Sequence, residues 1–193
     1  MSSSSPQRRG NTRQRIQDVA LELFAEQGYE KTSLREIAER LEVTKAALYY
    51  HFKTKEDIII SLFEDLTRPI DELIEWADEQ PQPLTLEMKK EVLRRYSEAV
   101  AGCVPLFRFM QENQATMREL SIGETMKQRL FRLVGLVRTE DGPLVDQVRC
   151  VSALFTMHAG MMFLQHMDSD PEQTRQAALE VAMDLITQAH HEK

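Results

Sequence analysis

The stretch SLREIAERLEVTKAALYYHF, residues 33–52, contains two short helical patterns separated by a turn. Ser33 and Glu36 have the spacing of a capping box, which opens the first pattern. Thr44 is placed to cap the second pattern. The inward positions of both patterns are apolar and recur at helical spacing: Leu34, Ile37, Ala38, Leu41, Ala47, Leu48 and Phe52. Two short helices joined by about four residues predict a helix-turn-helix.

In a helix-turn-helix, the second short helix lies in the DNA major groove with its first residues toward the base edges. If Leu48 faces the core, then Lys45, Ala46 and Tyr49 face outward. We expect Lys45 to donate to a guanine or to a phosphate, and Ala46 to allow close backbone approach or to contact a thymine methyl group. Thr44 can hydrogen-bond to a base or to a phosphate.

The charge of this segment supports the same surface. Residues 44–55 hold three lysines and no acid, although the whole chain has a formal net charge of −7. We expect Tyr49, Tyr50 and His51 to orient the duplex through phosphate contacts. Lys55 lies in the first turn of the next helix, where its ammonium group and the exposed backbone N–H groups both favour a phosphate.

Positive charge is concentrated in the first 55 residues, which carry ten Lys/Arg against seven Asp/Glu, whereas the remainder carries fourteen against twenty-four. A second basic cluster precedes the first acid of the chain and comprises Arg8, Arg9, Arg13 and Arg15. A polyanion, here double-stranded DNA, is therefore expected to approach this end of the chain.

Helical periodicity continues through most of the chain. A helix at about 11–27 ends at Gly28, which suits a left-handed C-terminal residue. A long helix opens at Thr54 and Asp57 and contains Pro69, which is expected to kink it. A loop is expected at 80–84, followed by a helix at about 85–101 and another that starts at Pro105. A capping box at 121–124 opens a helix that runs to about 138. The last two helices are expected at 145–167 and from Asp170–Pro171 onward, where Gln173 completes the cap.

These patterns predict an all-α protein of about nine helices. We expect a disordered arm at residues 1–10 and a three-helix DNA-binding domain at 11–55. The remaining residues, 56–193, are expected to form an effector-binding and dimerisation domain.

The last two helices are expected to form the dimer interface. The first carries apolar residues on nearly every side, which a surface helix does not tolerate, and the second has a stripe rich in small residues. Two such helices from each of two subunits make a four-helix interface. The residues assigned to it are Val151, Leu154, Met162, Ala178, Val181, Ala182, Leu185 and Ile186.

Aromatic and methionine side chains after the predicted head are candidates for an adaptable pocket that binds a small, largely apolar effector. The candidates are Trp76, Phe107, Met110, Met117, Met126, Phe131, Phe155 and His158. Two alternatives stay open. Methionine and phenylalanine at helical spacing are more often core residues, and a histidine on an apolar helix is more often a hydrogen-bonded core residue.

The sequence does not support several other classes of protein. The start MSSSSPQRRGN has no apolar segment behind it, and no apolar run approaches the roughly 18 to 20 residues of a membrane span, so we expect a cytoplasmic protein without membrane contact. Cys103 and Cys150 lie far apart, without metal-ligand spacing. We find no nucleophile, phosphate-loop or dinucleotide motif, so we expect no enzyme activity, cofactor or metal site.

Residues 12–59, TRQRIQDVALELFAEQGYEKTSLREIAERLEVTKAALYYHFKTKEDII, resemble the DNA-binding head of a TetR-type transcriptional regulator. The resemblance rests on the AxxLFxxxGY end of the first helix, the TSLREIA opening of the second and the closing LYYHFKTKEDI. It implies an all-helical homodimer whose last two helices pair with those of the partner subunit. It also implies DNA contacts by Ser33, Arg35, Thr44, Lys45, Ala46, Tyr49, Tyr50, His51 and Lys55.

The chain departs from the family pattern at Glu42, where members often have glycine, and at Ala47, where they have glycine or threonine. The operator sequence therefore cannot be copied from a relative. We expect a repressor that binds a palindromic operator as a dimer and is released when an effector moves the helix that contains Pro69. The alternative is an architectural or activating DNA-binding dimer without an effector.

Overall fold

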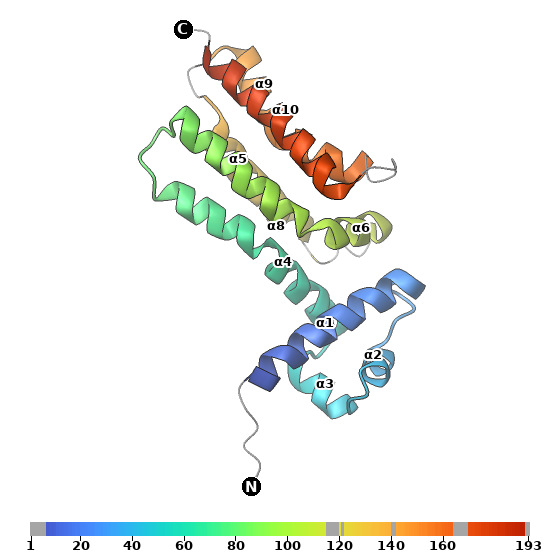
Figure 1. Cartoon of the computed structure of the whole chain (residues 1–193). Coiled ribbons are helices and arrows are strands. Elements are labelled where there is room, and N and C mark those ends of the chain that lie inside the picture. The colour runs from blue at the N-terminus through green and yellow to red at the C-terminus, as the bar shows by residue number, and fades with distance from the viewer. Residues whose placement is uncertain (1–6, 115–119, 121, 140–141, 164–169, 192–193) are drawn as a thin grey trace. The chain divides into compact units, whose positions relative to one another are not determined.

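The computed structural model describes residues 7–114, 120, 122–139, 142–163 and 170–191 of the chain. Within these ranges all regular elements are helices, which confirms the all-α prediction (Figure 1). The helices are α1 (Gln7–Gln27), α2 (Leu34–Arg40), α3 (Lys45–His51), α4 (Lys55–Asp78), α5 (Leu86–Ala101), α6 (Val104–Glu112), α8 (Ile122–Val137), α9 (Leu144–Phe163) and α10 (Pro171–His191).

The chain forms two compact units, which we call the head unit and the body unit. The head unit comes from residues 1–65 and 106–122, and the body unit comes from residues 66–105 and 123–193. None of the helices in the described ranges combines the length and the apolar character that a bilayer crossing requires.

Helix α1 forms the apolar centre of the head unit. It begins at Gln7 rather than at about residue 11, and it ends at Gln27 as predicted. Gly28 follows with a φ of +92°, and its N–H donates to the Phe24 carbonyl at 3.0 Å, so the chain leaves the helix through a left-handed residue. The buried side chains of α1 include Ile16, Ala20, Leu23 and Phe24, which recur at helical spacing, and the polar Gln17.

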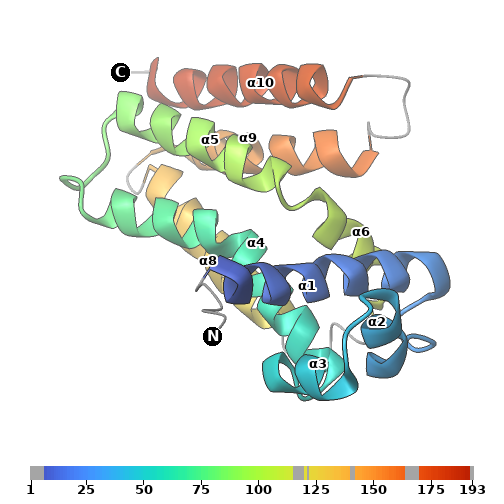
Figure 2. The same ribbon diagram turned by 60° about the horizontal axis from the view of Figure 1, so that its bottom comes forward.

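Helices α2 and α3 form the predicted helix-turn-helix, and both lie on one side of α1 (Figure 2). The Ser33 hydroxyl accepts from the Glu36 N–H, and the Glu36 carboxylate accepts from the Ser33 N–H at 2.7 Å, which confirms the capping box. Thr44 caps α3, because its hydroxyl oxygen accepts from the Ala47 N–H at 3.2 Å.

The turn between α2 and α3 carries a glutamate in the left-handed region. Glu42 has a φ of +55°, and its N–H donates to the Glu39 carbonyl at 3.1 Å. The Val43 N–H donates to the Ala38 carbonyl at 3.0 Å. This pair of hydrogen bonds is the Schellman motif, in which the left-handed position is usually glycine. A side chain with a Cβ is strained at this position.

We expect the variant Glu42→Gly to be more stable than the wild-type protein. Glycine removes a left-handed strain of about 1 to 2 kcal/mol but adds freedom to the unfolded chain, so the free energy of unfolding should rise by roughly 1 kcal/mol at most. Urea unfolding measures the change. The control is Glu39→Gly inside α2, which should lose about 1 kcal/mol. A less stable Glu42→Gly variant would contradict strain in this turn.

The body unit is built from the second half of α4 with α5, α8, α9 and α10. Helix α10 packs against α9 and α5 (Figure 1). Large side chains from four different helices fill the core: Ile70, Leu93, Leu133 and Leu154. Arg129 of α8 donates to both carboxylate oxygens of Asp71 of α4, at 2.7 Å each.

Several predicted helix boundaries in the body are confirmed. The 80–84 loop separates α4 from α5, and α4 runs from Lys55 to Asp78 with Pro69 inside it. Asp170 caps α10, since its carboxylate accepts from the Glu172 N–H at 2.8 Å. Ser121, the first residue of the predicted capping box at 121–124, lies outside the described residues.

Candidate nucleic-acid interface

The interface candidate centres on α3, which has one buried residue within the helix itself. Leu48 has no exposed surface, and it is the buried residue of this seven-residue helix. Lys45 and Ala46 are exposed, and Tyr50 is 74% exposed. Two of the three side chains predicted to face outward, Lys45 and Ala46, are therefore open to a nucleic acid. The third, Tyr49, is half-buried, and Ala47, which was predicted to face inward, is exposed.

The outward face combines aromatic rings with positive charge. The Lys45 ammonium lies 5.4 Å from the Tyr49 ring centroid. The rings of Tyr50 and His51 lie edge to face at 5.2 Å. Lys53 was not among the predicted contacts, although it belongs to the basic stretch 44–55. Its ammonium donates to the Tyr49 carbonyl at 2.6 Å, which stabilises the end of α3.

The predicted contacts on α2 are also exposed. Arg35 pairs with Glu39 at 2.7 Å, and most of its side chain faces solvent. The Ser33 hydroxyl is used in the cap and lowers the pKa of Glu36 by hydrogen-bonding to its carboxylate. A surface ion pair of this kind is weak, so Arg35 can exchange Glu39 for a phosphate at little cost.

Lys55 is oriented differently from the expectation. Its ammonium donates to the Tyr29 carbonyl at 2.8 Å and lies 4.2 Å from the centroid of the Tyr29 ring. The Tyr29 hydroxyl in turn donates to Glu56 at 3.0 Å. Lys55 therefore joins the start of α4 to the segment between α1 and α2. Its phosphate contact stays a prediction.

The predicted effector residues are not gathered in one place. Phe107 and Met110 belong to the head unit, whereas the others that the structure describes belong to the body unit. Phe131 is 64% exposed on α8, with the Lys127 ammonium 5.9 Å from its ring. Trp76 is half-buried, and the Arg95 guanidinium lies 3.9 Å from its ring. Met126 is also half-buried. Met117 lies outside the described residues.

His158 and Phe155 are the two predicted effector residues that the structure brings together. Their rings lie 5.9 Å apart, and His158 Nε2 is 2.7 Å from the hydroxyl oxygen of Tyr96 on α5. Tyr96 is almost fully buried. Burial lowers the pKa of His158 and raises the pKa of Tyr96, so both groups are held neutral.

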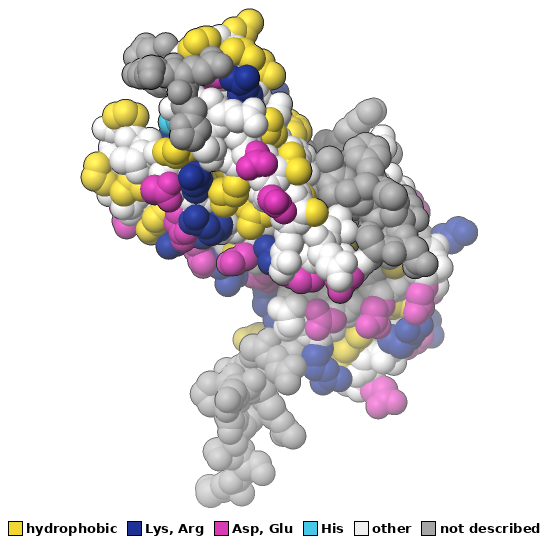
Figure 3. All heavy atoms as spheres, turned by 45° about the horizontal axis from the view of Figure 1, so that its top comes forward, with side chains coloured by type: hydrophobic (Ala, Val, Ile, Leu, Met, Phe, Trp, Pro, Cys, Tyr) yellow, Lys and Arg dark blue, Asp and Glu magenta, His cyan; other side chains and the backbone are white. Residues whose placement is uncertain are grey.

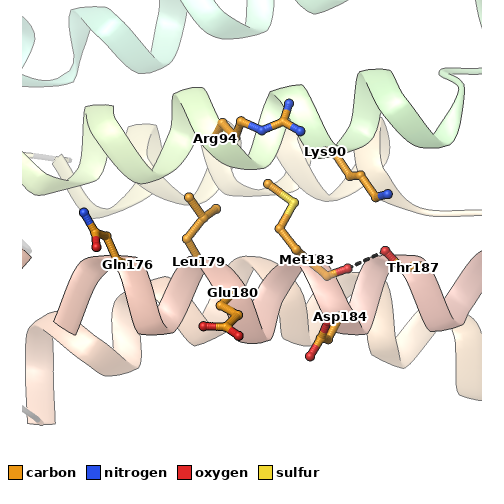
Figure 4. Close-up of a pocket in the computed structure, with 8 residues that line it drawn as sticks. All are labelled: Lys90, Arg94, Gln176, Leu179, Glu180, Met183, Asp184 and Thr187. Carbon is orange, nitrogen blue, oxygen red and sulfur yellow. Dashed lines mark hydrogen bonds between the residues drawn. The ribbon is translucent and has the colours of Figure 1, made fainter. Parts of the chain in front are cut away.

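A surface groove between α5 and α10 lies elsewhere in the body unit (Figure 4). Its volume is about 530 Å³. It is lined by Lys90 and Arg94 of α5 and by Gln176, Leu179, Glu180, Met183, Asp184 and Thr187 of α10. These side chains carry charges of both signs. The predicted effector residues are not among those lining the groove.

The last two helices present an apolar stripe to solvent. On α9 the exposed members are Leu144, Val145, Val148 and Phe155, and Val181 on α10 is also exposed. Figure 3 shows hydrophobic side chains on the surface of this region, beside charged ones. The stripe was not predicted as a set, because its side chains cannot be told from core residues by hydropathy.

The predicted dimer residues that the structure describes fall into three classes of exposure. Leu154, Ala182 and Ile186 are fully buried within the single chain, and Val181 is 49% exposed. Val151, Ala178 and Leu185 are half-buried. The side chain of Met162 lies outside the described residues.

Among the residues that the structure describes, no group of histidine, cysteine, aspartate and glutamate side chains could hold a metal ion.

Acidification is expected to weaken the folded state through His158. Because burial lowers the pKa of His158 below its ordinary value of 6.5, the unfolded chain takes up the proton more readily than the folded chain. The free energy of unfolding should therefore fall as the pH drops below about 6.5, and His158→Gln should reduce this fall. Urea unfolding at a series of pH values from about 8 to about 5 measures the effect.

The control for this experiment is Tyr96→Phe. Burial, rather than the tyrosine hydroxyl, lowers the pKa of His158, so this variant should keep the loss of stability in acid. If wild-type protein and His158→Gln show the same pH dependence, then His158 is not the group that titrates.

The amino-terminal part of the chain matches a family model. Residues 16–62 match the model described as "Bacterial regulatory proteins, tetR family". The HTH-type transcriptional regulator AcrR of Shigella flexneri is 47% identical over 64 residues, which are 33% of this chain and 30% of that protein. The family-model match, residues 16–62, lies within the head unit.

A second relative matches over a longer region. The fatty acid metabolism regulator protein of Bacillus subtilis is 27% identical over 138 residues, which are 69% of this chain and 66% of that protein. The chain thus covers less than two thirds of the length of either of these curated relatives.

Solved structures share the fold. The fatty acid degradation regulator FadR from Bacillus halodurans superposes with a TM-score of 0.63 at 19% identity, covering 94% of this chain and 97% of that chain. A TetR-family transcriptional regulator from Marinobacter aquaeolei superposes with a TM-score of 0.62 at 21% identity, covering 90% and 88%. At these identities the likeness establishes the all-helical fold alone.

Proposed function

We propose that this chain, a transcriptional regulator of the TetR family, binds a palindromic DNA operator as a homodimer. In this proposal it acts as a repressor, and a small, largely apolar effector releases it. The observation that carries the proposal is the face of α3. Leu48 is fully buried, so Lys45, Ala46 and Tyr50 are left exposed on a basic, aromatic surface of an acidic chain.

The proposed DNA contacts are divided by the chemistry of their side chains. Lys45, Ala46 and Thr44 lie at the start of α3, the part of a recognition helix that meets base edges. The remaining contacts are expected to meet phosphates, which position the protein without reading sequence. They are Ser33, Arg35, Tyr49, Tyr50, His51 and Lys55.

Dimerisation is supported by the apolar stripe of α9 and α10. Exposed valine, leucine and phenylalanine side chains grouped on two adjacent helices indicate a protein contact. Two such helices from each subunit would make a four-helix interface. A dimer places two recognition helices on one face of DNA about one turn, or roughly 34 Å, apart, and this spacing implies a palindromic or near-palindromic site.

The effector is proposed to be lipophilic. One relative is named for the regulation of fatty acid metabolism, and two of the predicted effector residues, Phe155 and His158, have their rings 5.9 Å apart in the body unit. The neutral Tyr96–His158 pair offers such a ligand one polar anchor. The effector must favour the DNA-incompetent state, with a coupling free energy of about 1 to 3 kcal/mol. The alternative, a DNA-binding dimer without an effector, predicts the same DNA contacts.

The first test is selection of bound fragments from sheared genomic DNA at about 150 mM salt, which suppresses non-specific phosphate binding. We expect enrichment of an inverted repeat. Lys45→Ala should weaken binding to the selected fragment by about 1 to 3 kcal/mol if Lys45 contacts a guanine. If Lys45 contacts a phosphate, the slope of log K against log salt should fall by about 0.9.

Tyr49→Ala should also weaken binding and leave the dimer intact, which size-exclusion chromatography can confirm. Enrichment of no sequence by the wild-type protein would refute sequence-specific DNA binding. Loss of the dimer in either variant would place the recognition surface elsewhere.

Charge introduced into the apolar stripe is expected to separate the subunits. Val148→Glu and Val181→Glu should each shift the protein from dimer to monomer, because an unpaired carboxylate would be buried at the contact. Analytical ultracentrifugation measures the change. The matched control is Phe131→Glu, since Phe131 is an exposed apolar residue of α8 outside the stripe. A dimer that survives both stripe variants would contradict this interface.

A further inference from the structure

A polar cluster is buried in the head unit between α1 and α4. Gln17 of α1 is 1% exposed, and Ser61 of α4 is 4% exposed. The Gln17 amide donates to the Ser61 hydroxyl oxygen at 2.6 Å and to Asp65 at 2.8 Å. Buried residues close to them in sequence on α1 and α4 are apolar, for example Ile16, Ala20 and Leu62. A polar contact is therefore placed where a packed apolar one would be expected.

Arg13, which is itself exposed, extends this buried cluster to the end of α3. Its guanidinium donates to the same Ser61 hydroxyl oxygen at 2.6 Å and lies 4.7 Å from the centroid of the Phe52 ring. Phe52 is the C-cap residue of α3 and is almost fully buried. Arg13 thus contacts α4 through a hydrogen bond and the end of α3 through a cation–π interaction. We define Arg13, Gln17 and Ser61 as the clamp.

Buried polar groups are satisfied only at particular geometries. The Ser61 oxygen accepts from two donors of α1, and this arrangement fixes the axial position of α1 against α4. Gln17 Oε1 is buried and accepts no hydrogen bond within the part of the chain that the structure describes. Burying a polar atom without a partner costs free energy, and an apolar contact of the same size would not. Compared with such an apolar contact, the clamp therefore contributes orientation rather than stability.

We propose that the clamp positions α3 for DNA recognition, in addition to the residues of the helix-turn-helix itself. Helix α3 has seven residues, and Leu48 in its middle and Phe52 at its end are its buried attachments. With Phe52 held by Arg13, the helix cannot turn about Leu48. This inference rests on the proposed function. It assigns Arg13 to positioning, although its charge alone suggests a phosphate contact.

The test compares Ser61→Ala with Ser97→Ala. Ser97 of α5 is an equally buried serine whose hydroxyl accepts from Arg175 of α10 at 3.1 Å, in the body unit. Both variants lose a hydroxyl that accepts from an arginine on another helix, and both should lower the melting temperature. Ser61→Ala should lower it more, because the Ser61 hydroxyl also accepts from Gln17. Only Ser61→Ala should weaken binding to the selected fragment, by about tenfold, the equivalent of roughly one base contact.

The salt dependence separates positioning from phosphate contact. Ser61→Ala should keep the wild-type slope of log K against log salt, because it removes no cation. Arg13→Gln should behave like Ser61→Ala and keep the slope although it removes a charge, because in this proposal Arg13 contacts Ser61 and Phe52 rather than a phosphate. In hydrogen exchange without DNA, the α3 amides should exchange faster in Ser61→Ala than in Ser97→Ala.

Three outcomes are decisive. Equal fragment binding by Ser61→Ala and Ser97→Ala would overturn the clamp. A reduced salt slope in Arg13→Gln would assign a phosphate contact to Arg13 instead. If the wild-type protein selects no fragment, the proposed function fails, and unchanged exchange of the α3 amides in Ser61→Ala would then overturn the positioning role independently.

Discussion

The burial of Leu48 is the contact on which the proposed DNA-facing surface depends. A seven-residue helix has too few internal hydrogen bonds to be stable alone, so its attachment to the head unit determines both its existence and its orientation. Because Leu48 is fully buried, Lys45, Ala46 and Tyr50 face outward. The cap at Thr44 and the turn at Glu42 bring the chain into α3, and Phe52 holds the other end.

The head could be predicted from sequence because its signals are local. The capping box at Ser33 and Glu36, the cap at Thr44 and the helix end at Gly28 each act within a few residues, and the structure confirms all three. The family comparison covers the same segment. What the sequence could not show was the direction of long cationic side chains. Arg13 and Lys55 count as positive charge, yet both contact aromatic rings within the head unit.

The body was less predictable because hydropathy does not identify the partner of a buried residue. Leu154 and Val148 lie on the same helix and are equally apolar, but the first is buried within the chain and the second is exposed. Only the arrangement of α5, α9 and α10 separates them. For the same reason the exposure of Phe131 could not be predicted. Phe131 belongs to an aromatic and methionine-rich pattern, but it lies on the exposed face of α8.

The exposed stripe of α9 and α10 makes protein concentration part of the regulatory mechanism proposed here. If the stripe is covered only by a second subunit, every operator complex consumes two chains. Below the dimer dissociation constant, occupancy of the operator then rises with the square of the protein concentration. A modest change in synthesis or degradation of the chain would therefore alter repression more than in proportion, even when the amount of effector is constant.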